Sequence, residues 1–234
     1  KVNGKLGPLA ARPRSGVGSV SLSNYKKALL HFLEEAGISE KNEWVRRVAK
    51  AQIYRQKTLA RFLLFAASEN AIPDCKDPGL VVSGRLGLLP MLTPKNWNNK
   101  DYLTVEHVAP QSGRSTWDQK IYDEPETVDL LGNLTLLPMR ENSMVGDKEW
   151  QHKKALYQVL SAQDQAEFDQ YMKNFSSVGL SLSHKAKEIL DEANYLPLCR
   201  SIGQRVGDWD LDFIKKRSER LSELAWDRMR AWLN

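Results

Sequence analysis

A histidine with a carboxylate beside it closes a short alternating segment, in the run DYLTVEHVAPQSG at residues 101–113. Glu106 and His107 stand just before Pro110, and proline ends strands because it has no N–H to donate to a ladder. A neutral histidine, whose ordinary pKa is about 6.5, can take a proton from water at neutral pH. A lone strand-end histidine is more often bonded to backbone, so its neighbours must decide between the two interpretations.

Two asparagines follow in an order that suits hydrolysis assisted by a metal ion. Asn133 stands in the run LLGNLTLLP, where its amide could tie the preceding loop to the first strand, orient His107, or form a turn after Gly132. Asn142 is expected just before the next helix. There its carbonyl oxygen could face an ion, or its side chain could cap the helix.

Glu106 is the candidate ligand for a hard ion such as Mg²⁺, which prefers oxygen donors and supplies positive charge to phosphate oxygens. Neighbouring residues of a strand point to opposite faces. Glu106 and His107 can therefore reach one ion only if the strand breaks at this point, as Pro110 permits; otherwise Glu106 is an exposed strand carboxylate. Lys153 could meet a phosphate, although a surface lysine on an amphipathic helix is the ordinary interpretation.

The elements that must position these residues are indicated by periodicity. Alternation predicts a strand at 102–107, and the run LLGNLTLLP, which Pro138 ends, predicts a second at 130–138, with a polar loop between them that contains Trp117. Helical spacing predicts helices at 23–37, 42–69, 141–160, 163–175, 183–195 and 210–233. Residues 72–99, rich in Pro, Gly and Asn, are expected to form loops with at most a short turn of helix.

Strand, loop, strand and helix form the skeleton of a ββα-metal site. We therefore expect a mainly α fold, a helical domain with an inserted two-stranded ββα-metal motif. The expected division is a linker or N-terminal arm at 1–20, a helical subdomain at 21–99, the ββα-metal core at 100–160, and C-terminal helices at 161–234 that pack on the core.

Composition sets wider limits. With 234 residues and 41% hydrophobic content, the chain can bury one sizeable core or two small ones. No apolar run approaches the roughly 20 residues that cross a bilayer, and no signal peptide opens the chain, so we expect a cytoplasmic protein without membrane contact. The unpaired Cys75 and Cys199 are expected to be reduced and inert, and not zinc ligands.

The net charge of +5 suits a polyanionic partner without requiring one, because 29 acidic residues are mixed among 34 Lys and Arg residues. One basic cluster lies in the second expected helix and is either a solvated face or a phosphate-facing surface. It consists of Arg46, Arg47, Lys50, Arg55, Lys57 and Arg61.

At its motifs the chain resembles the HNH nuclease superfamily and, more closely, the C-terminal nuclease domain of the GmrSD-type restriction endonucleases. The matching motifs read Glu106-His107-Val108-Ala109-Pro110, Trp117, Gly132-Asn133-Leu134-Thr135-Leu136, Asn142 and Trp150-x-x-Lys153. The family's last helix is similar at Ile214, Arg217, Leu221, Ala225 and Trp226. The resemblance covers about residues 100–230. Val108 and Ala109 replace larger aliphatic residues, which should change packing and not chemistry.

The resemblance implies a metal-dependent DNA endonuclease or nickase, the effector of a bacterial restriction or phage-defence protein that acts on foreign, often modified, DNA. His107 would be the base, Asn142 with Glu106 would hold Mg²⁺ or Mn²⁺, and Asn133 would support the site. The family joins such a domain to an N-terminal NTP-binding module. This chain has no GxxxxGK[ST] phosphate loop, so that partner module would lie outside it.

Basic residues near the site are candidates for contacts to DNA phosphates. They are Arg114, Lys120, Arg140, Lys148, Lys153 and Lys154. Two alternatives stay open at this point: a non-catalytic helical domain that binds nucleic acid or protein through a decayed HNH insertion, and a nuclease directed at RNA.

Overall fold

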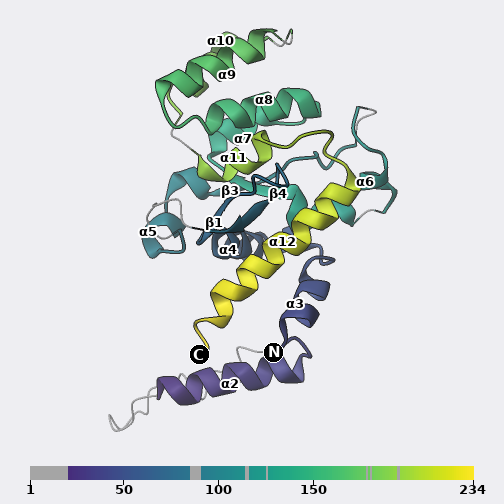
Figure 1. Ribbon diagram of the computed structural model, residues 1–234, viewed down its shortest axis with the longest axis vertical. Coiled ribbons are helices and arrows are strands. Elements are labelled where there is room, and N and C mark those ends of the chain that lie inside the picture. The colour runs from purple at the N-terminus through teal and green to yellow at the C-terminus, as the bar shows by residue number, and fades with distance from the viewer. Residues whose placement is uncertain are drawn as a thin grey trace.

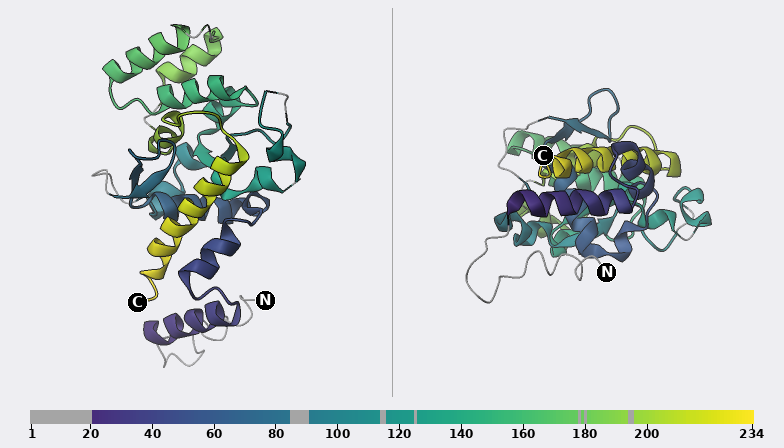
Figure 2. Two further views of the ribbon diagram at one scale, coloured as in Figure 1. Left: turned by 45° about the vertical axis from the view of Figure 1, so that its right-hand side comes forward. Right: turned by 90° about the horizontal axis from the view of Figure 1, so that it is seen from below.

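The computed structural model describes residues 21–84, 91–113, 116–124, 126–177, 179, 181–193 and 196–234. The fold is mainly helical with two small antiparallel two-stranded sheets, which confirms the expected class. The strands lie in the middle of the molecule, with α9 (Gln165–Ser177) and α10 (His184–Asp191) at one end and α2 (Leu22–Glu35) at the other (Figures 1 and 2). The expected arm at 1–20 lies outside the described residues.

The sheet that carries His107 pairs β3 (Thr104–His107) with β4 (Leu134–Leu137). His107 stands opposite Leu134, and all four residues of β4 are buried. α7 (Met139–Val145) begins directly after Pro138, so the expected order of strand, loop, strand and helix is confirmed. The loop holds α6 (Lys120–Asp123), η3 (Thr127–Asp129) and η4 (Leu131–Asn133).

A second hairpin, which the sequence did not predict, pairs β1 (Ala71–Pro73) with β2 (Val81–Ser83). Each strand is only three residues long, too short for an alternating pattern to show, so the prediction of loops over 72–99 was incomplete. The same region also holds α5 (Pro94–Trp97), and η2 (Lys100–Tyr102) follows it.

The long helix predicted at 42–69 is wrong, because the chain divides there into α3 (Lys41–Val48), η1 (Ile53–Arg55) and α4 (Lys57–Ser68). Gln52 forms an isolated antiparallel bridge with Leu130, which takes its backbone out of the helical ladder. The helix predicted at 141–160 also divides, into α7 and α8 (Trp150–Leu160). It breaks at Gly146, whose φ of +50° favours glycine. The first break brings η1 toward the loop that precedes β4.

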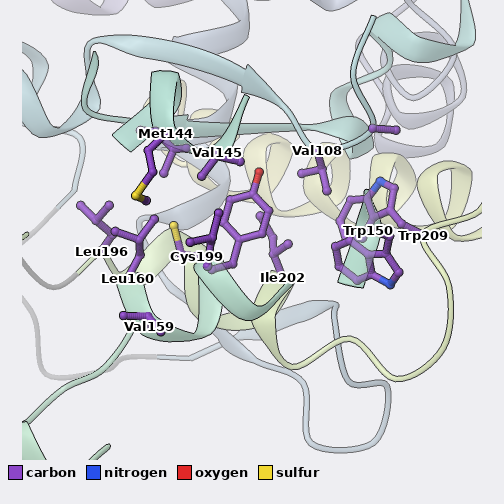
Figure 3. Close-up of a cluster of buried hydrophobic side chains, with 14 of the residues drawn as sticks. Val108, Met144, Val145, Trp150, Val159, Leu160, Leu196, Cys199, Ile202 and Trp209 are labelled. Atoms are coloured by element: carbon purple, nitrogen blue, oxygen red, sulfur yellow. The ribbon is translucent and has the colours of Figure 1, made fainter. Parts of the chain in front are cut away.

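The C-terminal half closes the core. α11 (Pro197–Gly203), a seven-residue helix that the sequence did not predict, packs on α8, and α12 (Leu211–Arg230) crosses α4 and η4 (Figure 1). Around α8, Trp150 and Trp209 lie side by side near Val108, and Cys199 is buried among aliphatic side chains (Figure 3). Cys75 and Cys199 are both free. Among the described residues, no helix is long and apolar enough to cross a membrane.

Gly132 lets α12 approach the chain just before β4. Its N–H donates to Ser218 Oγ at 2.8 Å, and a Cβ built on it would lie 2.0 Å from the carbonyl oxygen of Ile214. Ile214 and Ser218 both belong to α12, so the clash can be relieved only by moving α12 and the chain before β4 apart.

Replacing Gly132 with alanine is therefore expected to lower the free energy of unfolding by about 3 kcal/mol, the upper part of the range for overpacking. Urea titration followed by circular dichroism measures the change. The control is Ser143→Ala, an exposed position on α7, where a change of about 0.5 kcal/mol or less is expected. Equal stability of the Gly132→Ala variant and the wild type would show that α12 does not fit this closely.

Candidate active site

His107 is the last residue of β3, and its ring is buried, with the residue only 6% exposed. Its Nε2 lies 3.0 Å from Oδ1 of Asp129, the last residue of η3. An ionised carboxylate can only accept hydrogen bonds, so this contact assigns the imidazole proton to Nε2 and leaves the lone pair on Nδ1. The carboxylate thus fixes both the ring orientation and the nitrogen that can act as a base.

Two further residues surround this pair. The Tyr54 ring, from η1, lies 4.1 Å from the His107 ring between centroids and is inclined by 60°. Gln111 donates from Nε2 to the same Asp129 oxygen at 3.3 Å. Burial lowers the pKa of His107, and the Asp129 carboxylate opposes this change. The imidazole is therefore neutral at neutral pH, which is the form that a general base requires.

Glu106 points away from this group, toward α8, as strand alternation requires. Lys153 of α8 is fully buried, and its ammonium donates to Glu106 Oε1 at 2.8 Å, to the His107 carbonyl at 2.7 Å and to the Val108 carbonyl at 2.8 Å. These three bonds use every donor of the ammonium. The predicted contact between Lys153 and a phosphate is therefore wrong, because Lys153 is an internal cation that fixes the end of β3.

This ion pair affects the titration of both of its members. Burial raises the pKa of Glu106 and lowers the pKa of Lys153, and in each case the opposite charge of the partner acts against burial.

Asn142 lies within α7 and not before it, so the predicted position ahead of the helix is corrected. Its Nδ2 donates to Thr104 Oγ1 at 2.8 Å, and Thr104 in turn donates to the Leu137 carbonyl at 2.7 Å. Thr104 and Glu106 are two residues apart on β3 and share a face. Asn142 and Glu106, the two predicted metal ligands, are therefore on the same side of the strand, while His107 faces the other.

Asn133 is fully buried, and its amide ties the loop to the end of β3. Its oxygen accepts from the Ala109 N–H at 2.8 Å and from Trp209 Nε1 at 3.0 Å, and its nitrogen donates to the carbonyls of Ala109 at 2.9 Å and Val128 at 2.8 Å. Every hydrogen-bonding position of the amide is used. These bonds support the predicted loop-tying role and leave no group of Asn133 to touch a substrate.

The predicted DNA-contacting residues stand in different settings. Arg140 is exposed and pairs with the exposed Glu192 at 2.8 Å, while Lys148 is half-buried and donates to the Met144 carbonyl at 2.7 Å. Arg114 lies outside the described residues. The contacts of these three residues with DNA stay predictions.

Whether the site can hold a metal ion depends on which side-chain atoms can serve as its ligands. Among the described residues, no three His, Cys, Asp or Glu side chains gather as a ligand cluster. Mg²⁺ needs fewer, since it keeps several waters and binds one or two carboxylates together with substrate phosphate oxygens. The hydrogen bond to Thr104 uses the nitrogen of Asn142 and not its carbonyl oxygen, and Lys153 bonds one oxygen of Glu106. These oxygen donors fit a minimal Mg²⁺ site and do not fit a fully protein-made one.

Comparison with known proteins decides the family. The family of GmrSD restriction endonucleases, C-terminal domain, matches residues 85–224, more than half of the chain. The chain belongs to this family. No curated protein matches it. Membership in the GmrSD C-terminal family implies a nuclease effector of a restriction system, with DNA as its substrate and a divalent metal ion. The matched range holds β3, β4, α7 and α8, whereas η1, which supplies Tyr54, precedes it.

Proposed function

We propose that this chain is a Mg²⁺-dependent DNA endonuclease or nickase in which His107 is the general base. The observation that carries the proposal is the buried contact between His107 and Asp129 at the end of β3, which orients a neutral imidazole. The chain would be the effector of a bacterial restriction or phage-defence protein, and an NTP-binding module would be its partner. We also propose that the chain is organised as a helical subdomain at 21–99, a ββα-metal core at 100–160 and C-terminal helices at 161–234.

In the proposed reaction, Nδ1 of His107 takes a proton from a water molecule, and the water oxygen forms a bond to phosphorus. The bond from phosphorus to the leaving sugar oxygen then breaks, and that oxygen takes a proton from solvent. Asp129 stabilises the imidazolium formed in the first step and keeps the ring in its orientation. Asn133 and Lys153 hold the backbone from His107 to Ala109 and touch no reacting atom.

Glu106 and Asn142 would hold the metal ion. When bound, Mg²⁺ supplies positive charge to the non-bridging and leaving oxygens of the phosphate. Glu106 would use the oxygen that Lys153 does not bond, and Asn142 would use its amide carbonyl. Since His107 and Glu106 face opposite sides of β3, the substrate phosphate would have to approach at the end of the strand, where the two sides meet.

The function is tested by incubating the purified chain with supercoiled plasmid and with a structured RNA of similar length, in Mg²⁺, in Mn²⁺ and in EDTA. The proposal predicts conversion of the plasmid to nicked or linear forms in either metal, no conversion in EDTA, and slower cleavage of the RNA. Faster cleavage of the RNA would favour an RNA-directed nuclease. Retention of DNA without cleavage in either metal would favour the non-catalytic binding domain.

Replacing Asp129 with asparagine is expected to slow plasmid cleavage by at least about 10- to 100-fold, the effect of losing the carboxylate partner of a metal-bound histidine. The amide keeps the size of the side chain but can present an N–H to Nε2, which favours the wrong tautomer. Initial rates at saturating Mg²⁺ measure the change. Asp123→Asn, an exposed change on α6, is the control and should keep the wild-type rate. A wild-type rate for Asp129→Asn would remove Asp129 from the mechanism.

A further inference from the structure

Two lysines lie close to His107, and they differ in what they can reach. Lys153 donates to the His107 carbonyl, and Lys57 lies over the Tyr54 ring that packs against the imidazole. Lys153 is fully buried, with its three donors used by Glu106 and two backbone carbonyls. Lys57 is the first residue of α4, and its side chain is exposed. Of these two charges, only that of Lys57 can meet a substrate.

Lys57 is held beside the site through an aromatic ring. Its Nζ lies 5.0 Å from the centroid of the Tyr54 ring, and the centroid of that ring is 4.1 Å from the centroid of the His107 ring. A cation over the face of a tyrosine is attracted by the ring, so Tyr54 acts as a platform between the lysine and the histidine. Lys57 also lines an open hollow on the protein surface with Leu59, Phe62 and Trp97.

The Asp129 carboxylate, which bonds the histidine, disfavours an approaching phosphate. Lys153 is buried and paired with Glu106, so its ammonium cannot contact that phosphate. An exposed cation beside the ring would offset the Asp129 carboxylate and add to the attraction that a bound metal ion supplies.

We propose that Lys57 binds a phosphate of the DNA backbone next to the bond that is cut, so that a segment outside the family-matched residues 85–224 contributes to the substrate-binding surface. This inference rests on the proposed nuclease function.

The other basic residues around Lys57 help to single it out. Several are engaged in contacts within the protein: Arg46 pairs with Glu43, Arg47 donates to the Ala36 carbonyl, and Arg61 donates to the carbonyls of Trp97 and Tyr102. Lys50 is exposed on the same stretch of chain but precedes η1 and does not lie over the Tyr54 ring as Lys57 does. Lys50 is therefore the matched control for Lys57.

The test compares Lys57→Gln with Lys50→Gln in two measurements. The first is binding of a fluorescent 20-base-pair duplex by each variant in the His107→Ala background, in which cleavage is expected to be about 10²- to 10⁴-fold slower, over a series of salt concentrations. The slope of log affinity against log salt should fall by about 0.9 in magnitude for Lys57→Gln, the value for one lost phosphate contact, and should not change for Lys50→Gln. The second is plasmid cleavage with wild-type His107. There the half-saturating DNA concentration should rise severalfold for Lys57→Gln, with the rate at saturation unchanged.

An unchanged salt slope for Lys57→Gln would overturn the proposal, as would failure of the parent protein to bind the duplex. A lower rate at saturation with the original slope would also overturn it, because Lys57 would then act on His107 and not on phosphate. A changed slope in a protein whose wild-type form does not cleave would instead leave the phosphate contact standing and refute the nuclease function. Thermal unfolding of both variants should match the wild type.

Discussion

Replacing His107 with alanine is expected to lower the initial rate of plasmid cleavage by about 10²- to 10⁴-fold, the range that one general base contributes. The change removes the Nδ1 lone pair and the contact of the imidazole with Asp129, whose carboxylate keeps its bond from Gln111. The end of β3 should survive, because it is held by backbone bonds that do not involve the imidazole. Lys153 bonds the His107 and Val108 carbonyls, and Asn133 bonds both backbone groups of Ala109.

The control for this variant is His184→Ala, because His184 is an exposed histidine at the start of α10. Its rate should equal that of the wild type. Circular dichroism and the urea midpoint of His107→Ala should stay close to wild-type values, so that a lost rate cannot be attributed to unfolding. If His107→Ala is folded and cleaves at the wild-type rate, His107 is not the base and the proposed mechanism is wrong.

Replacing Lys153 with methionine is expected to lower the free energy of unfolding by about 3–5 kcal/mol, the cost of breaking a buried ion pair by removing one partner. Methionine fills much of the same space but cannot donate. The Glu106 carboxylate and the carbonyls of His107 and Val108 would then lose their shared donor in the protein interior. Urea titration measures the loss, and the control is Lys154→Met, the neighbouring half-buried lysine.

A second variant separates the charge from the packing. Adding Glu106→Gln to Lys153→Met removes the uncompensated carboxylate, so the double variant should be more stable than Lys153→Met alone. If Lys153→Met is as stable as the wild type, the ammonium does not fix the end of β3. If the double variant is no more stable than the single one, the cost comes from the two carbonyls and not from the charge on Glu106.

Much of the secondary structure could be predicted from the sequence, because it depends on local patterns. β3 follows from alternation, β4 from the run that Pro138 ends, and α12 from apolar residues at helical spacing. The break at Gln52 could not be predicted, because it results from a bridge to Leu130, which is distant in sequence. The hairpin of β1 and β2 was missed because three-residue strands carry no periodic signal.

The candidate site also contains residues that the sequence predicts and residues that it does not. Motif order pointed to His107, Asn133 and Asn142, but it could not name Asp129, since a histidine's partner is chosen by the tertiary fold. Asp129 does stand directly before the LLGNLTLLP run, and this acidic position beside a motif was the available signal. No pattern in the sequence points to Tyr54, because helical spacing predicts one continuous helix at 42–69, whereas Tyr54 lies in η1.

Helical periodicity predicts an exposed Lys153, because it identifies the apolar face of a helix but does not say which polar residue points inward. A lysine on an amphipathic helix is expected to face solvent. The buried acceptors that hold Lys153 become visible only when β3 and α8 are packed together. For a buried charge of this kind, the partner and not the sequence position decides the role.

The role of His107 as the base in metal-dependent DNA cleavage is tested most directly by a time course of supercoiled plasmid cleavage. It uses equal folded concentrations of wild type and His107→Ala, each in Mg²⁺ and in EDTA. We expect the wild type in Mg²⁺ to convert the plasmid to nicked or linear DNA, His107→Ala in Mg²⁺ to do so at least about 100-fold more slowly, and neither protein to do so in EDTA. Conversion by the wild type that persists in EDTA, or equal conversion by His107→Ala in Mg²⁺, would contradict it.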